Sequence, residues 1–154
     1  TPFKEEKYSG INDYWGDVPI GECIAGDYTG ALDTGTICGA LETIFRYCLN
    51  TFVGKPVCFV IVHKVQETGH QINGKGNTFK DYRDAMVMVC GKYSIPYYDA
   101  FMGSGLNGWN AAQSAAYLTA NGNGTADGTH PNEEGYKRYY VPQLLALFRS
   151  MMKV

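Results

Sequence analysis

The chain has 154 residues, of which 45% are hydrophobic and 18% are charged, a composition typical of one globular domain with its own core. The net charge of −2 comes from 13 basic and 15 acidic residues scattered without blocks, which excludes nucleic acid and anionic membrane surfaces as expected partners. The longest apolar run, residues 57–62, is far shorter than the roughly 20 residues that cross a bilayer, so no membrane span is expected. Five cysteines, an odd number without zinc-site spacing, argue against a complete disulfide framework and a zinc centre.

The first half of the chain predicts a long loop, a helix and a strand. Residues 15–36 are rich in glycine and acidic residues and have no sustained hydrophobic period, which is typical of a long loop. A helix is then expected up to Phe52, because apolar side chains recur at helical spacing: Ile37, Leu41, Ile44, Cys48 and Phe52. Residues 57–62 are wholly apolar, as expected for a strand of a parallel sheet that is covered on both faces.

The next elements continue the alternation of strands and helices. Residues 65–77 form a polar loop, residues 78–93 return to a helical period, and residues 95–102 predict a short second strand. The order strand, helix, strand favours an α/β domain with a parallel sheet, whose ligand sites lie at the carboxyl ends of the strands.

The last part of the chain predicts two further helical pieces. An alanine-rich stretch, residues 111–120, predicts a short helix inside a segment rich in Gly and Asn. A longer helix is expected over residues 133–152, with Pro142 kinking or splitting it near Val141. Its periodicity predicts that the following side chains are buried: Tyr136, Tyr140, Leu144, Leu147, Phe148 and Met151.

A carboxylate and an imidazole lie three residues apart just before this last helix. Asp127 can accept a hydrogen bond from one ring nitrogen of His130, which leaves the other nitrogen to take a proton from a nucleophile. Pro131 biases His130 away from helical dihedral angles, and Asn132 is a suitable N-cap for the helix. The pair is therefore expected on a loop that is fixed at a helix start, where it can act as an acid–base pair.

A second motif lies far upstream and precedes this pair in chain order. It has the pattern G-x-N-D, in the residues Gly10, Ile11, Asn12 and Asp13. Together with D-G-x-H-P-N-x-x-G-Y from Asp127, it resembles the SGNH hydrolases, also called GDSL-type lipases or acylhydrolases. The resemblance covers nearly the whole chain.

The resemblance implies a fold, an activity and a role for each matching residue. The fold would be a three-layer α/β/α, flavodoxin-like domain, and the activity hydrolysis of a carboxylic ester, such as a lipid acyl chain, an acetylated glycan or a small aryl ester. Asn12 would donate its side-chain amide to the oxyanion, Asp127 would orient the base, and His130 would be the general base. No cofactor or metal would be needed, and a secreted or cell-surface location is favoured over a cytoplasmic one.

The nucleophilic serine of that family has no counterpart here. No G-D-S motif occurs, because Gly26 and Asp27 are followed by Tyr28. Ser9 directly precedes the glycine of the G-x-N-D pattern and is interpreted as structural, and Ser104 lies late in the chain, in the loop before Asp127. The sequence is therefore interpreted as the later part of a hydrolase domain, incomplete at its amino end. Self-association or pairing with an amino-terminal fragment is then expected, because an incomplete sheet exposes an unpaired edge.

Other side chains are weaker candidates for contacts with the substrate. Aromatic rings near the two motifs could line a pocket, and His63 ends the apolar strand on the side where ligands bind, in a solvated or substrate-facing position; the set is Tyr14, Trp15, His63 and Trp109. His63 and His70 are also alternatives to His130 as base, but neither has an acid at short spacing. A metal site formed by these two histidines and Asp99 lacks any recognisable spacing, and Asp99 is better suited to a supporting role.

Two further functions stay open from the sequence. The chain could be a non-catalytic α/β binding domain that keeps the cleft without the nucleophile, although the presence of Asn12, Asp127 and His130 argues against this. It could also be one fragment of a two-chain esterase whose G-D-S segment is supplied by another polypeptide.

Overall fold

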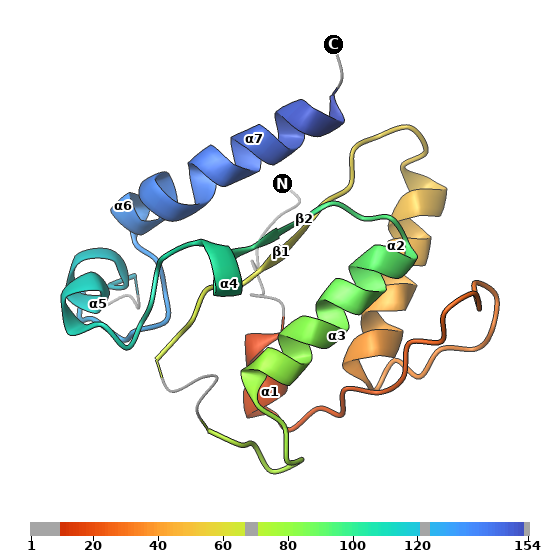
Figure 1. Cartoon of the computed structure of the whole chain (residues 1–154), viewed down its shortest axis with the longest axis horizontal. Coiled ribbons are helices and arrows are strands. Elements are labelled where there is room, and N and C mark those ends of the chain that lie inside the picture. Colours follow the sequence, from red (N-terminus) through yellow and green to blue (C-terminus); the bar gives the residue numbers. More distant parts are fainter. Residues whose placement is uncertain (1–9, 67–70, 121–123, 153–154) are drawn as a thin grey trace.

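The computed structural model describes residues 10–66, 71–120 and 124–152 (Figure 1). Its elements, in chain order, are α1 (Ile11–Trp15), α2 (Ile37–Thr51), β1 (Phe59–Ile61), α3 (Phe79–Lys92), β2 (Tyr97–Asp99), α4 (Ala100–Gly103), α5 (Ala111–Tyr117), α6 (Glu133–Gly135), the π-helical turn η1 (Tyr136–Tyr140) and α7 (Val141–Met151). None of the helices in these residues is long and apolar enough to cross a membrane.

The two predicted strands are neighbours in a parallel sheet. In the register of β1 and β2, Phe59 pairs with Tyr97 and Ile61 with Asp99. Both strands are shorter than predicted. In particular, the expectation of a strand up to residue 102 is wrong, because the side chain of Asp99 accepts a hydrogen bond from the backbone N–H of Met102 and caps the short helix α4.

The alternation of side chains along β1 places a hydrophobic core on each face of the sheet. Phe59 and Ile61 belong to the larger core, which α1, α2 and α3 cover. Val60 points the other way and packs in a smaller core with Leu118 and Tyr140. Figure 1 accordingly shows α2 and α3 on one side of the strands and α7 on the other. The described chain is therefore a mixed α/β structure with a small parallel sheet.

The two long helices begin where the sequence predicts them. Thr36 caps α2 by accepting a hydrogen bond from the backbone N–H of Gly39 at 3.1 Å. Thr78 precedes α3, and its backbone N–H donates to the side chain of Asp81 at 2.7 Å. Both predicted helices, 37–52 and 78–93, are confirmed to within a residue at each end.

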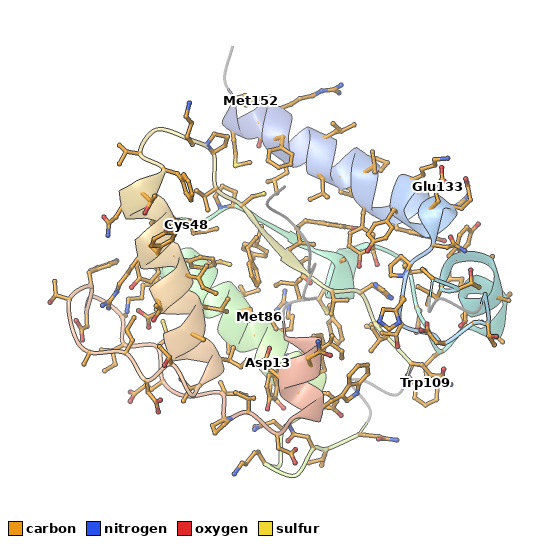
Figure 2. All side chains as sticks on the ribbon, turned by 180° about the vertical axis from the view of Figure 1, so that it is seen from behind. Asp13, Cys48, Met86, Trp109, Glu133 and Met152 are labelled. Atoms are coloured by element: carbon orange, nitrogen blue, oxygen red, sulfur yellow. The ribbon has the colours of Figure 1, made fainter. Side chains whose placement is uncertain are left out.

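The last helical run differs from its prediction in burial. The break near Val141 is confirmed, since η1 gives way to α7 at that residue with Pro142 in the first turn. Figure 2 shows the two ends of the run at Glu133 and Met152. Of the side chains predicted to be buried only Tyr140 is, while Phe148 is 37% exposed. The other four are half-buried: Tyr136, Leu144, Leu147 and Met151.

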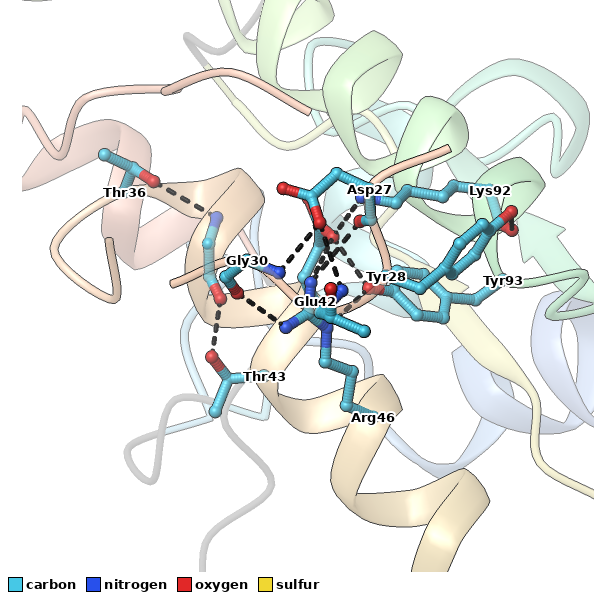
Figure 3. A network of polar contacts seen from close by, with 11 residues as sticks. Asp27, Tyr28, Gly30, Thr36, Glu42, Thr43, Arg46, Lys92 and Tyr93 are labelled. Atoms are coloured by element: carbon cyan, nitrogen blue, oxygen red, sulfur yellow. Dashed lines mark hydrogen bonds and ion pairs between the residues drawn. The ribbon is translucent and has the colours of Figure 1, made fainter. Parts of the chain in front are cut away.

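A buried ionic network fastens the loop that leads into α2 (Figure 3). Glu42 on α2 is only 1% exposed, and its carboxylate accepts hydrogen bonds from Lys92 at 2.5 Å and from the hydroxyl of Tyr93 at 2.7 Å. Arg46, one turn further along α2, donates to the hydroxyl of Tyr93 and to the carbonyl of Gly30, both at 2.8 Å. The network therefore ties the loop, α2 and the carboxyl end of α3 together.

Candidate active site

The predicted hydrogen bond between the carboxylate and the imidazole is present. The Oδ2 atom of Asp127 lies 2.5 Å from Nδ1 of His130. The other carboxylate oxygen, Oδ1, accepts the backbone N–H groups of Thr129 and His130, both at 2.9 Å. Because the same short turn supplies all three donors, the spacing of three residues is enough to fix the carboxylate against the ring.

The electrostatics of the pair suit an orienting acid and an accessible base. Burial by itself raises the pKa of Asp127, but the backbone N–H and ring of His130 and the backbone N–H of Thr129 outweigh burial and lower the pKa below its usual value. The side chain of Asp127 is 23% exposed and that of His130 is 44% exposed. The carboxylate thus stays ionised at neutral pH, while the imidazole can be reached by a reactant.

The loop between α5 and α6 carries Asp127 and His130 and is called the dyad loop below. Three chain segments cross beside it and hold it at the carboxyl end of the sheet. The backbone N–H of Gln66, which follows β1, donates to the carbonyl of Gly128 at 2.9 Å. The backbone N–H of Gly108, which follows β2 and α4, donates to the carbonyl of Lys64 at 2.7 Å. A Cβ atom on Gly108 would lie 2.1 Å from the carbonyl oxygen of Gly128, so the segments can approach this closely only with glycine at that position.

The other side of the dyad loop rests on α5. The Asn132 side chain caps α6 by accepting from the N–H of Gly135 at 2.9 Å, which confirms the predicted N-cap. Its amide also donates to the carbonyl of Ala116 at 3.0 Å and to the hydroxyl of Thr119 at 2.8 Å. The chain on both sides of His130 is therefore anchored, which limits the movement of the imidazole.

Asn12 lies on α1, and its side chain is exposed. Helix α1 packs against the first half of α3 through the ring of Tyr14, which meets Phe79 and Tyr82 edge to face. In Figure 2, Asp13 of α1 and Trp109 both lie in the half of the molecule into which the carboxyl ends of the strands point. The role of Asn12 as oxyanion donor stays a prediction.

Two of the aromatic or histidine candidates for substrate contact are buried instead. Tyr14 is 4% exposed, and its hydroxyl donates to the carbonyl of Gln71 at 2.9 Å, so its ring is part of the core. His63 is 0% exposed, which makes the expectation of a solvated or substrate-facing position wrong. Tyr14 is buried because its ring packs in the larger core, and His63 is buried because its ring lies against Tyr140 of the smaller core. Trp15 and Trp109 are 51% and 49% exposed and keep surface for a ligand.

Further polar residues have structural partners. Asp99 pairs with Arg83 and caps α4, and the hydroxyl of Ser104 accepts the backbone N–H of Leu106 at 3.0 Å. Ser9 and His70 lie outside the described residues. Within the described part of the chain, no three His, Cys, Asp or Glu side chains are grouped as metal ligands.

The sequence did not predict the partner of His63. Its Nδ1 lies 2.7 Å from the hydroxyl of Tyr140, and its backbone N–H donates to the same oxygen at 3.3 Å. The two residues are 77 positions apart, and Tyr140 carries no local signal beyond its place in the hydrophobic period. Only the packing of η1 on the end of β1 brings them together.

Comparisons with known proteins define the fold more than the function. No protein-family model and no curated protein matches the chain. A structural-genomics crystal structure of a protein from Lactobacillus plantarum is similar, with a TM-score of 0.71 and 24% identity over 94% of this chain. A second crystal structure is similar over 92% of the chain, with a TM-score of 0.74 and 24% identity. The chain spans 65% and 61% of the lengths of these two proteins, respectively, less than two thirds of either.

Proposed function

We propose that the chain is the later part of an ester hydrolase of the SGNH type, with a three-layer, flavodoxin-like fold in the complete domain. The observation that carries the proposal is the hydrogen bond between Asp127 and His130. Both side chains are partly exposed, and their loop is hydrogen-bonded to the segment that follows β1. Open α/β sheets place their ligand sites at this end of the strands. The sequence motifs that contain Asn12 and Asp127 support the same assignment.

The chemistry is acyl transfer to a serine followed by hydrolysis. His130 takes the proton of the serine hydroxyl as the oxygen attacks the ester carbonyl, while Asp127 holds Nδ1 and stabilises the imidazolium that forms. The tetrahedral oxyanion is bound in part by the amide of Asn12. His130 then protonates the leaving alcohol, and an activated water releases the acid from the serine. The glycine-rich, polar loops around the site favour a short acyl group.

The serine belongs to a segment outside these 154 residues. The similar structures support this assignment, because more than a third of each lies outside the part that the chain matches. A strand followed by G-D-S, supplied upstream in the same polypeptide or by a second chain, would complete both the sheet and the triad. The substrate is then a small-molecule or glycan ester.

The experiment compares the chain alone with the chain completed by its G-D-S segment. Alone, it should hydrolyse p-nitrophenyl acetate no faster than the variant His130→Ala. With the segment fused or co-expressed, turnover should appear. Asp127→Asn should then lower kcat by about 10⁴-fold, and Asn12→Ala by about 10²–10³-fold.

Two results would contradict this proposal. Rapid turnover by the chain alone would mean that the nucleophile lies within it, with Ser9 and Ser104 the first to replace. A completed and folded protein without esterase activity would favour a non-catalytic α/β binding domain instead.

A row of partly exposed apolar side chains along α7 supports the proposal that another segment or chain packs against this helix. Four side chains at helical spacing are between 37% and 52% exposed: Val141, Leu145, Phe148 and Met152. We expect the chain alone to self-associate through this row in sedimentation experiments, and Leu145→Glu to shift it to monomer. A monomer at high concentration would contradict the expectation.

A further inference from the structure

His63 is a buried polar group, and only one of its two ring nitrogens has a hydrogen-bond partner among the described residues. Its side chain is 0% exposed, and Nδ1 lies 2.7 Å from the hydroxyl of Tyr140. Its Nε2 atom is also buried and has no hydrogen-bond partner among the residues that the structure describes. A neutral imidazole has one donor and one acceptor nitrogen, so Nε2 is left with an unmet donor or acceptor in either tautomer. An apolar ring would avoid this cost, which argues that the imidazole is required for its chemistry.

The surroundings of His63 connect it to the dyad. The pKa of His63 is lowered to about 4, mainly by burial and to a smaller extent by the positive charge of His130, while the carboxylate of Asp127 acts in the opposite direction. His63 is therefore neutral at pH 7 and lies within the electrostatic field of the pair. A positively charged group at this place would oppose the imidazolium that forms on His130 during the reaction.

Tyr140 links His63 to the helix that continues from the dyad loop. The hydroxyl of Tyr140 meets both the ring and the backbone N–H of His63, and the two rings are edge to face at 6.0 Å. Tyr140 ends the π-helical turn η1, which follows α6 directly. Turns of this kind widen a helix by one residue and are frequent at functional sites. Here the turn directs Tyr140 toward the end of β1.

We propose that His63 and Tyr140 form a positioning pair for the Asp127–His130 dyad. The bond of His63 to Tyr140 fixes the helical run that begins three residues after His130, and the ring of His63 is neutral and so adds no charge near the dyad. Neither residue reacts with the substrate. This inference rests on the proposed function, because a positioning role has meaning only if His130 is the base.

The test reads the dyad directly, without requiring activity. The ring nitrogens of His130 are followed by long-range ¹H–¹⁵N correlation spectra of the chain in five forms: wild type, Asp127→Asn, His63→Phe, Tyr140→Phe and His63→Asn. Asp127→Asn defines the pattern of a broken dyad. We expect Tyr140→Phe and His63→Phe to shift the His130 signals toward that pattern. His63→Asn should keep most of the wild-type pattern, in contrast to His63→Phe, because its amide keeps a polar atom near the position of Nδ1.

Tyr93→Phe is the matched control. It removes one hydrogen-bonded tyrosine hydroxyl in the ionic network and should lower thermal stability without moving the His130 signals. In the completed enzyme, Tyr140→Phe should lower kcat by about 10- to 100-fold with KM unchanged. Tyr140→Phe deletes a single oxygen, so the test stands even if His63→Phe does not fold.

The outcomes separate the two proposals. If Asp127→Asn shifts the His130 signals and neither His63→Phe nor Tyr140→Phe does, the positioning pair is wrong and the dyad stands. If Asp127→Asn also leaves the signals unchanged, the dyad does not form and the proposed function fails with it.

Discussion

The dyad loop and the loop before α2 are both long and glycine-rich, yet different forces hold them. The loop before α2 is fastened by charges that are almost fully buried, with the side chains of Glu42 and Lys92 2% and 5% exposed. The dyad loop is held by backbone hydrogen bonds at the crossing near Gly108, while the side chains of Asp127 and His130 are 23% and 44% exposed.

The pKa of a carboxyl group is lowered in both regions, Glu42 in one and Asp127 in the other, but the consequences differ. The pKa of Glu42 is lowered although burial raises it, because Lys92 and Tyr93 donate to the carboxylate. All of these partners are themselves held in the network, so the charge of Glu42 is not accessible to a reactant. Asp127 is stabilised mainly by donors from its own turn, which leaves the ring of His130 accessible. Ionic groups thus serve the fold in one region and are available for chemistry in the other.

The comparison predicts that removing one buried charge has the largest effect on stability. Lys92→Met removes the nearer of the two cations beside the carboxylate of Glu42 and leaves only Arg46, at 3.7 Å, so it should lower the free energy of unfolding by about 3 kcal/mol. The control is Lys80→Met on the same helix, whose pair with Asp84 is exposed and should contribute about 0–1 kcal/mol. Urea unfolding of both variants checks this. Equal losses would mean that the network is not the main fastening of its loop.

Adding a side chain where the three backbone segments cross should have the next largest effect on stability. Gly108→Ala places a methyl group against the carbonyl of Gly128 and should cost about 3 kcal/mol, with loss of the His130 ring signals typical of the intact dyad. Gly91→Ala in α3 meets nothing within 4 Å and should stabilise the chain by about 0.5–1 kcal/mol. Thermal unfolding distinguishes the two. A harmless Gly108→Ala would show that the crossing does not hold the dyad loop.

A pH change should have a smaller effect that arises at the dyad end. The pKa of His63 is about 4 in the folded chain and 6.5 ordinarily, so between these values the unfolded chain binds more protons. Stability should therefore fall by about 2 kcal/mol as pH drops from 7 to 5. The lowered pKa values of Asp127 and Glu42 act mainly below this range, where stability is lost as these carboxylates are protonated.

His63→Asn isolates this contribution, because it removes the titrating ring and keeps the other groups near it, namely Asp127, His130 and Tyr140. Its stability should be nearly constant between pH 7 and pH 5 in urea titrations. A slope equal to that of the wild type would show that His63 is not held neutral by burial.

Local signals in the sequence were sufficient for the main elements and for the dyad. The apolar period from Ile37 predicted α2, and the alternation of strand and helix predicted the parallel pairing of β1 and β2. Asp127 and His130 meet because two residues of one turn, Thr129 and His130, supply three donors to the carboxylate. Contacts of this range depend on few residues, so a pattern of spacing is enough to predict them.

Long-range packing decided the rest. The sequence determined that Asp127 faces His130 and that Asn132 caps the following helix, since backbone geometry over three or four residues fixes both contacts. Only the tertiary structure decided that His63 is buried against Tyr140, because the partner lies 77 residues away and is selected by how η1 packs on the sheet. The close approach of Gly108 to Gly128 was equally hidden, since a glycine in a polar loop carries no sign of which backbone will pass beside it.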